Sequence, residues 1–166
     1  MTAIKSYSAR TNEIDPLPRL VPRRLPSVER YCSMLEYEVT ARRVDEHGSL
    51  ALCKEASILL DTDIAGRRDA FNPAELFLAA IAACMIKGIE RVAPMIHFKL
   101  ARVEVRLKAV RQDAPPRIVS VDYELLVETS ETDQRLELLH TNVRKYGTIS
   151  NTVAEATRLR GVIRKA

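Results

Sequence analysis

An apolar stretch at residues 76–86 constrains the fold of this 166-residue chain more than any other feature. Apart from the thiol of Cys84, the stretch contains only aliphatic and aromatic side chains and methionine. A helix that is apolar on every side is normally buried. The stretch is shorter than the roughly 20 apolar residues that cross a bilayer, and Lys87 follows it directly. We therefore expect a buried central helix in a soluble domain, with no membrane association.

The residues around this stretch predict where the helix begins and ends. Asn72 can cap the free amides, and Pro73 suits the first helical position, where a missing N–H costs nothing. Glu75 falls in the first turn, where the helix dipole favours a carboxylate. Pro94 predicts an end near Ala93.

Composition and charge predict one soluble domain with an N-terminal arm. The chain is 46% hydrophobic and 29% charged, which is typical of a single globular domain. Residues 1–32 are basic and proline-rich and predict an extended arm, which leaves one domain over residues 33–166. The arm has neither the apolar segment of a signal peptide nor a nucleic-acid motif, so we expect a cytoplasmic protein without a nucleic-acid partner. We interpret the arm as a solvated tether, with binding to a protein partner as the alternative.

Hydrophobic periodicity predicts an α+β domain. Alternation of apolar and polar side chains predicts strands, and the spacing of apolar residues further on predicts a second long helix. We expect the strands to form an antiparallel sheet that packs on the central helix. Ser150 is the expected cap of a last short helix, and Val162 and Ile163 a last edge strand. The predicted strands are 35–42, 50–60 (one strand or two), 102–108 and 119–127, and the predicted helix is 131–146.

Several chemistries find no support in the sequence. The five glycines are scattered and cannot form a phosphate-binding loop. His47, His97 and His140 lie far apart, and we expect them in a turn, just before a strand and on a helix surface. Three cysteines match neither a zinc pattern nor a disulfide framework. We therefore expect no metal and no cofactor.

Cys84 is either inert packing or a sheltered nucleophile. A nucleophilic thiol must be ionised, and a nearby cation lowers its pKa. Arg67 and Arg68, in the loop before the central helix, are the best candidates for that cation, and Lys87 is a weaker one. The alternative is that both arginines belong to an ordinary solvated loop.

The residues of the central helix resemble a known motif. This motif resembles that of the OsmC-like/organic hydroperoxide resistance family. Three further features resemble the same family: the order of the strands and helices, Leu60-Asp61 before a polar loop, and residues 145–152. The resemblance implies an intertwined α+β homodimer with sites at its interface. It also implies that Cys84 is the thiol that reduces organic hydroperoxides. The motif is Asn72-Pro73-x-Glu75-Leu76-x-Leu78-Ala79-Ala80-x-Ala82-Ala83-Cys84.

The chain departs from the family pattern on the central helix. Many catalytic members carry a carboxylate directly after the Asn-Pro pair, where this chain has Ala74. Glu75 follows one residue later, and helical geometry places it on the face opposite Cys84. Glu75 is therefore either an active-site partner or a first-turn residue that interacts with the helix dipole.

A second departure concerns the resolving cysteine. The family position of this cysteine is occupied by Gly147, and no thiol follows Cys84. Cys32 and Cys53 are possible substitutes, although we expect each to be a small buried or edge residue. An external thiol can also reduce a sulfenic acid on Cys84.

These observations lead to two functional hypotheses. The first is a thiol-dependent peroxidase that reduces organic hydroperoxides through Cys84, with Arg67, Arg68 and Glu75 as supporting residues and an external thiol as reductant. The second is a non-catalytic dimer of the same fold that binds a small hydrophobic molecule. The missing carboxylate at Ala74 and the missing thiol at Gly147 favour the second hypothesis.

Overall fold

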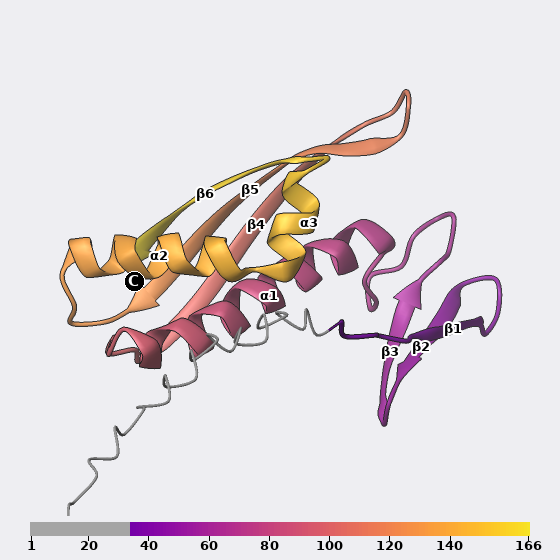
Figure 1. Cartoon of the computed structure of the whole chain (residues 1–166). Coiled ribbons are helices and arrows are strands. Elements are labelled where there is room, and N and C mark those ends of the chain that lie inside the picture. The colour runs from indigo at the N-terminus through magenta and orange to yellow at the C-terminus, as the bar shows by residue number, and fades with distance from the viewer. Residues whose placement is uncertain (1–33) are drawn as a thin grey trace, which may run out of the picture. The chain divides into compact units, whose positions relative to one another are not determined.

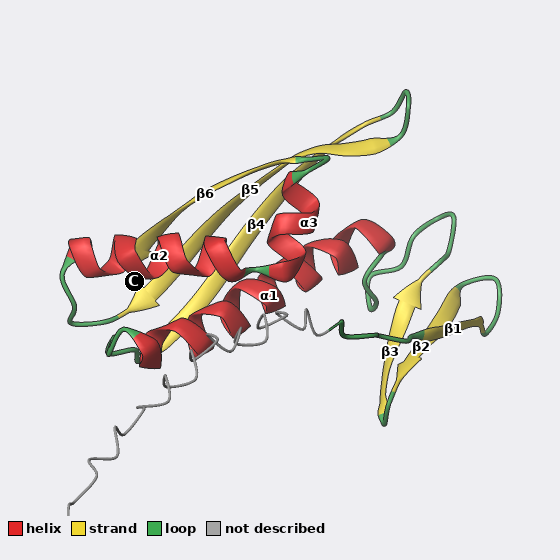
Figure 2. Cartoon of the chain, in the orientation of Figure 1, coloured by secondary structure: helices red, strands yellow, loops and turns green. Residues whose placement is uncertain are grey.

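The computed structural model describes residues 34–166. The predicted arm and Cys32 lie outside the described residues. Glu38–Ala166 form one compact unit with two three-stranded sheets and three helices (Figures 1 and 2). The elements are β1 Thr40–Arg43, β2 Gly48–Cys53, β3 Ala56–Asp61, α1 Pro73–Met95, β4 Arg102–Gln112, β5 Arg117–Glu128, α2 Asp133–Tyr146, α3 Thr148–Ala154 and β6 Arg158–Lys165.

The first sheet is antiparallel in the order β1-β2-β3. The predicted stretch 50–60 is split into β2 and β3 by a turn in which Lys54 has a φ of 55°. The predicted first strand is too long, because only Thr40–Arg43 are paired and residues 34–39 have no regular structure. The register explains this difference: Thr40 pairs with Leu52, and β2 ends one residue later.

The start of α1 matches the prediction. The Asn72 side chain accepts a hydrogen bond from the Glu75 N–H at 3.0 Å, and the Glu75 carboxylate accepts one from the Asn72 N–H at 2.9 Å. This reciprocal capping box satisfies two amides. The helix continues through Pro94 to Met95, two residues beyond the predicted end. Two residues after the helix ends, the chain turns at His97, whose φ of 50° is left-handed.

Among the described residues of one copy, burial of α1 is confined to one face of the helix. Ile81, Met85, Ile89 and Val92 lie along one face and are almost inaccessible to solvent. They join the β5 side chains in the core. On other faces Ala80, Ala83 and Ile86 are exposed, because the described residues supply a sheet and two helices to only part of the helix surface.

The second sheet is mixed, which corrects the prediction of an antiparallel sheet. β4 and β5 form the predicted antiparallel hairpin, but β6 pairs parallel to β5, with Ser120 opposite Arg158. Parallel neighbours need a crossover connection, and here α2 and α3 provide it. Gly161 on β6 faces Tyr123, and a Cβ at this position would lie 2.3 Å from the Tyr123 carbonyl oxygen.

The predicted helix at 131–146 is confirmed as α2, with Thr132 as its N-cap. Leu136, Leu139 and Val143 are buried against the core, as their spacing predicts. Ser150 is not a cap but a buried residue inside α3, and Gly147 occupies the N-cap position instead. Among residues 34–166, no helix is long and apolar enough to span a membrane.

Candidate functional site

Cys84 lies midway along α1 and is partly buried. It precedes Gly88 by one helical turn, so the two residues lie on the same face of the helix. Gly88 packs against Val143 of α2, because a Cβ on Gly88 would lie 3.2 Å from the Val143 Cγ1 atom. The thiol is therefore near the surface along which α1 contacts α2.

The position of Gly147 follows from this helix contact. α1 and α2 run in opposite directions (Figure 1). Cys84 lies one turn before Gly88 on α1, and Gly147 lies one turn after Val143 on α2. Because the two helices are antiparallel, both steps run in the same direction. Each of the two residues therefore lies about 6 Å along the helix axis from the contact between Gly88 and Val143. The position of the missing second thiol is therefore beside the turn that carries Cys84.

The space around Gly147 is already filled. A Cβ on Gly147 would lie 3.1 Å from the Ser150 Oγ atom and 3.2 Å from the Val143 carbonyl oxygen. The φ of Gly147 is −79°, which any residue adopts, so the backbone does not require glycine. A cysteine is therefore compatible with the backbone but needs a small shift of its neighbours.

Arg67 is held within its own loop. Its guanidinium donates two hydrogen bonds of 2.7 Å to the Asp69 carboxylate, and its N–H donates to Asp61 at 3.0 Å. The bond with Asp69 raises the pKa of Arg67 and lowers the pKa of Asp69. Gly48 makes room for this fork, since a Cβ there would lie 2.8 Å from the Arg67 Nη1 atom. The Nε–Nη2 edge of the guanidinium is therefore engaged by Asp69.

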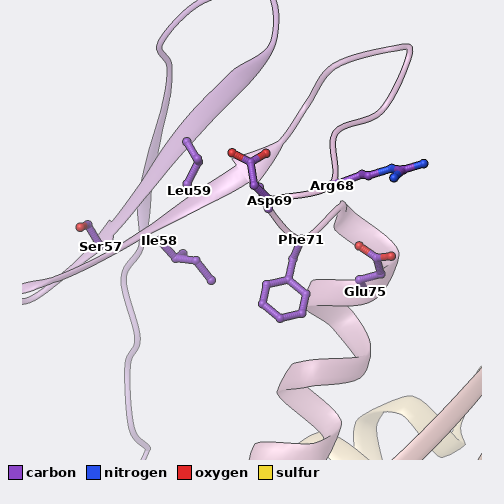
Figure 3. A pocket seen from close by; sticks show the side chains of 8 residues that line it. Ser57, Ile58, Leu59, Arg68, Asp69, Phe71 and Glu75 are labelled. Carbon is purple, nitrogen blue, oxygen red and sulfur yellow. The ribbon is translucent and has the colours of Figure 1, made fainter.

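Arg68 lines an open pocket of about 730 Å³ at the start of α1. No ion pair joins it to another residue within the described part of the chain. Its side chain extends away from Ile58 and Phe71, on the side of Glu75 (Figure 3). The carboxylate of Glu75 lines the same pocket but also belongs to the capping box. The lining residues are Ser57, Ile58, Leu59, Arg68, Asp69, Ala70, Phe71 and Glu75.

The predicted site residues do not meet within one chain. Arg68 and Glu75 share the pocket, but Cys84 does not line it. Nine helical residues separate Glu75 from Cys84, which places them about 13 Å apart along the axis and on opposite faces. Lys87 is exposed on the following turn of α1. Cys53, expected to be a buried or an edge residue, is exposed at the end of β2.

A buried polar pair was missed in the sequence. The His140 Nε2 atom lies 2.8 Å from the Tyr123 hydroxyl, and both side chains are buried. Burial raises the pKa of Tyr123 and lowers that of His140. The prediction of a surface histidine is wrong because His140 lies one residue after Leu139 on the inner face of α2. The described residues contain no group of three or more side chains able to hold a metal ion.

Comparison with known proteins agrees with this fold. The OsmC-like protein from Mycoplasma pneumoniae has a TM-score of 0.72 and 15% identity, over 80% of this chain and 98% of that chain. An organic hydroperoxide resistance protein from Elizabethkingia anophelis has a TM-score of 0.66 and 14% identity, over 81% and 100%. The organic hydroperoxide resistance protein OhrB of Bacillus subtilis has a TM-score of 0.61 and 15% identity, over 80% and 100%. No curated protein matches the sequence.

The family follows from the sequence itself. Residues 66–160, from the loop before α1 into β6, match the family model described as OsmC-like protein. The chain therefore belongs to the OsmC-like family.

Proposed function

We propose that this protein is a thiol-dependent peroxidase that reduces organic hydroperoxides through Cys84. The observation that supports the proposal is the place of the thiol, partly buried on an apolar helix and beside Gly147. The Cys84 thiolate attacks one peroxide oxygen, the O–O bond breaks, and the other oxygen leaves as an alcohol after taking up a proton. The cysteine is thereby oxidised to sulfenic acid, and the hydroperoxide is reduced.

We propose an external thiol as the reductant, because Gly147 provides no second sulfur. One thiol condenses with the sulfenic acid and releases water, and a second thiol then reduces the mixed disulfide and regenerates Cys84. This chemistry needs a compartment that keeps thiols reduced. The cytoplasm meets this condition, so we place the protein there.

We further propose a homodimer in which the site lies at the interface. The uncovered face of α1 carries small side chains, and β3 exposes Ile58 and Leu59. A second copy can cover these surfaces and bring the Arg68 of one copy toward the Cys84 of the other. Arg68 is a better partner than Arg67, whose guanidinium is engaged by Asp69.

The first experiment follows the pH dependence of Cys84 alkylation in a Cys32→Ser, Cys53→Ser background. It is followed by exposure to an organic hydroperoxide with trapping of the sulfenic acid. We expect rapid alkylation at neutral pH and rapid trapping of the sulfenic acid, both absent after Cys84→Ser. A Cys84 thiol that is alkylated slowly at neutral pH and resists the peroxide would overturn the peroxidase proposal.

The two arginines provide a matched pair for the next step. We expect Arg68→Ala to slow alkylation of Cys84 and Arg67→Ala to act mainly by loosening its loop. Equal rates in wild type and Arg68→Ala, with the fold intact, would remove Arg68 from the mechanism. Circular dichroism and thermal melting distinguish a loosened loop from a lost activator.

A second candidate function is binding of a small hydrophobic molecule without catalysis. The pocket of about 730 Å³ supports it, because Ile58, Leu59 and Phe71 give the pocket an apolar wall (Figure 3). Binding of an apolar fluorescent probe that Phe71→Ala abolishes, together with an unreactive Cys84, would favour this function. Reactive Cys84 and no probe binding would favour the peroxidase.

A further inference from the structure

A second cavity lies where α2 and α3 approach the large sheet. Its volume is about 320 Å³, at the small end of the range for ligand pockets. It shares no residue with the pocket of Arg68 and Glu75, and Cys84 does not line it. The lining residues are Met85, Tyr123, Thr141, Arg144, Lys145, Ser150, Asn151, Ala154 and Leu159.

The charge of this cavity is positive. Arg144 and Lys145 line it, and no carboxylate is among the lining residues. Within the described part of the chain, neither cation forms an ion pair, and the Lys145 ammonium lies 5.4 Å from the centre of the Tyr146 ring. Two cations without a counter-charge favour an anion, because hydrogen bonds between charged groups are the strongest that side chains make.

The hydroxyl of Ser150 is the second indication of a ligand. Ser150 lines the cavity and is only 6% exposed, yet its hydroxyl forms no hydrogen bond with a described residue. No buried side-chain polar atom of the described residues lacks a hydrogen-bond partner, so the Ser150 hydroxyl is accessible to solvent rather than enclosed. A ligand atom in the cavity can therefore take the place of solvent at this hydroxyl.

The positive charge of Arg144 acts on Tyr123, which also lines the cavity. Burial raises the pKa of Tyr123, and the positive charge of Arg144 acts against that rise. Burial also lowers the pKa of His140; the nearby Glu137 carboxylate raises it, and the Arg144 guanidinium lowers it. Both directions agree with a guanidinium that lies close to the buried Tyr123–His140 pair.

We propose that this cavity binds a small molecule that carries one oxyanion group, a carboxylate or a phosphate, next to a short apolar part. Arg144, Lys145 and the Ser150 hydroxyl hold the oxyanion. Met85 and Leu159 contact the apolar part, since they provide apolar wall within the same cavity. The site is independent of the proposed peroxide chemistry, because it uses none of that site's residues.

Isothermal titration calorimetry of the full chain at low ionic strength and neutral pH tests this proposal. Inorganic phosphate and hexanoate are the two probes, and the variants are Arg144→Gln, Ser150→Ala and the control Arg117→Gln. Arg117 is exposed at the start of β5 and does not line the cavity. We expect at least one probe to bind, with binding about tenfold weaker in Arg144→Gln and unchanged in Arg117→Gln. Ser150→Ala is expected to weaken binding by a smaller factor.

The outcomes distinguish a phosphate ligand from a carboxylate ligand, and specific binding from a general effect of charge. Binding of phosphate alone indicates a phosphate ligand, and binding of hexanoate alone indicates a carboxylate with an apolar tail. Absence of binding by both probes at about 10 mM would overturn the proposal. Equal weakening by Arg144→Gln and Arg117→Gln would also overturn it, because general charge would then explain the binding. Circular dichroism verifies that each variant is folded.

Discussion

The two three-stranded sheets of this protein differ in how their side chains are covered. On β5, Val121, Leu125 and Val127 are fully buried under α1 and α2. On β3, Ile58 and Leu59 are 38% and 37% exposed, although the strand is fully paired with β2. Backbone pairing is therefore similar in the two sheets, whereas apolar burial is not. The described residues therefore build a core for the large sheet but not for the small one.

The largest effect is expected in the large sheet. Leu125→Ala removes a fully buried side chain and leaves a cavity, so we expect a loss of about 2–5 kcal/mol in the free energy of unfolding. Urea unfolding followed by circular dichroism measures it. A loss below about 1 kcal/mol would mean that the core collapses around the gap and that the contrast between the sheets is weak.

A smaller effect is expected where β3 leads into the loop before α1. Asp61 is buried and accepts hydrogen bonds from the Asp63 and Arg67 N–H groups. Asp61→Ala leaves both amides without this partner, and we expect a loss of about 1–3 kcal/mol. Asp61→Asn keeps one acceptor oxygen and should lose less in the same unfolding assay. Identical losses in the two variants would show that charge, not hydrogen bonding, is what matters.

The core of the large sheet also predicts a pH dependence. Burial holds the pKa of His140 below its ordinary 6.5, so the unfolded chain takes up a proton before the folded protein does. The contribution of His140 to stability is present above pH 6.5 and is lost as the pH falls below it. His140→Gln removes this contribution. The difference in the free energy of unfolding between wild type and variant should therefore shrink as the pH falls. Unfolding at several pH values measures this difference, and a constant difference would contradict the prediction.

The smallest effect is expected in the small sheet. Leu59→Ala removes a side chain that is already partly in water, so the loss in a monomer should be below about 1 kcal/mol. Unfolding at low protein concentration measures this value. A loss that grows with protein concentration would show that a second copy covers β3. A loss as large as that of Leu125→Ala in the monomer would remove the contrast between the sheets.

Local signals in the sequence predict much of the fold. The capping pair Asn72 and Glu75 is formed by neighbours, so its residues are sufficient to place the start of α1. The β4–β5 hairpin is also local, and its alternation predicts the pairing. The parallel pairing of β6 depends on the path of the chain through α2 and α3. The apolar residues Val162 and Ile163 predict a strand but not its direction.

The candidate site is less predictable because it depends on partners that are not adjacent in sequence. The sequence treats Arg67 and Arg68 alike, but Asp69 and Asp61 hold only Arg67. His140 has the spacing of a core residue, and its hydrogen bond to Tyr123 bridges 17 residues. Periodicity could have placed His140 inside, but it could not have identified its partner.

The parallel pairing of β6 affects the order in which the molecule folds. The β4–β5 hairpin closes over a short turn, whereas pairing Ser120 with Arg158 closes a loop of about 38 residues. Contacts distant in sequence form late, so completion of the large sheet should follow formation of α2 and α3. During synthesis, one edge of β5 is therefore unprotected until β6 has emerged. Until then, that edge is open to wrong pairing with other strands.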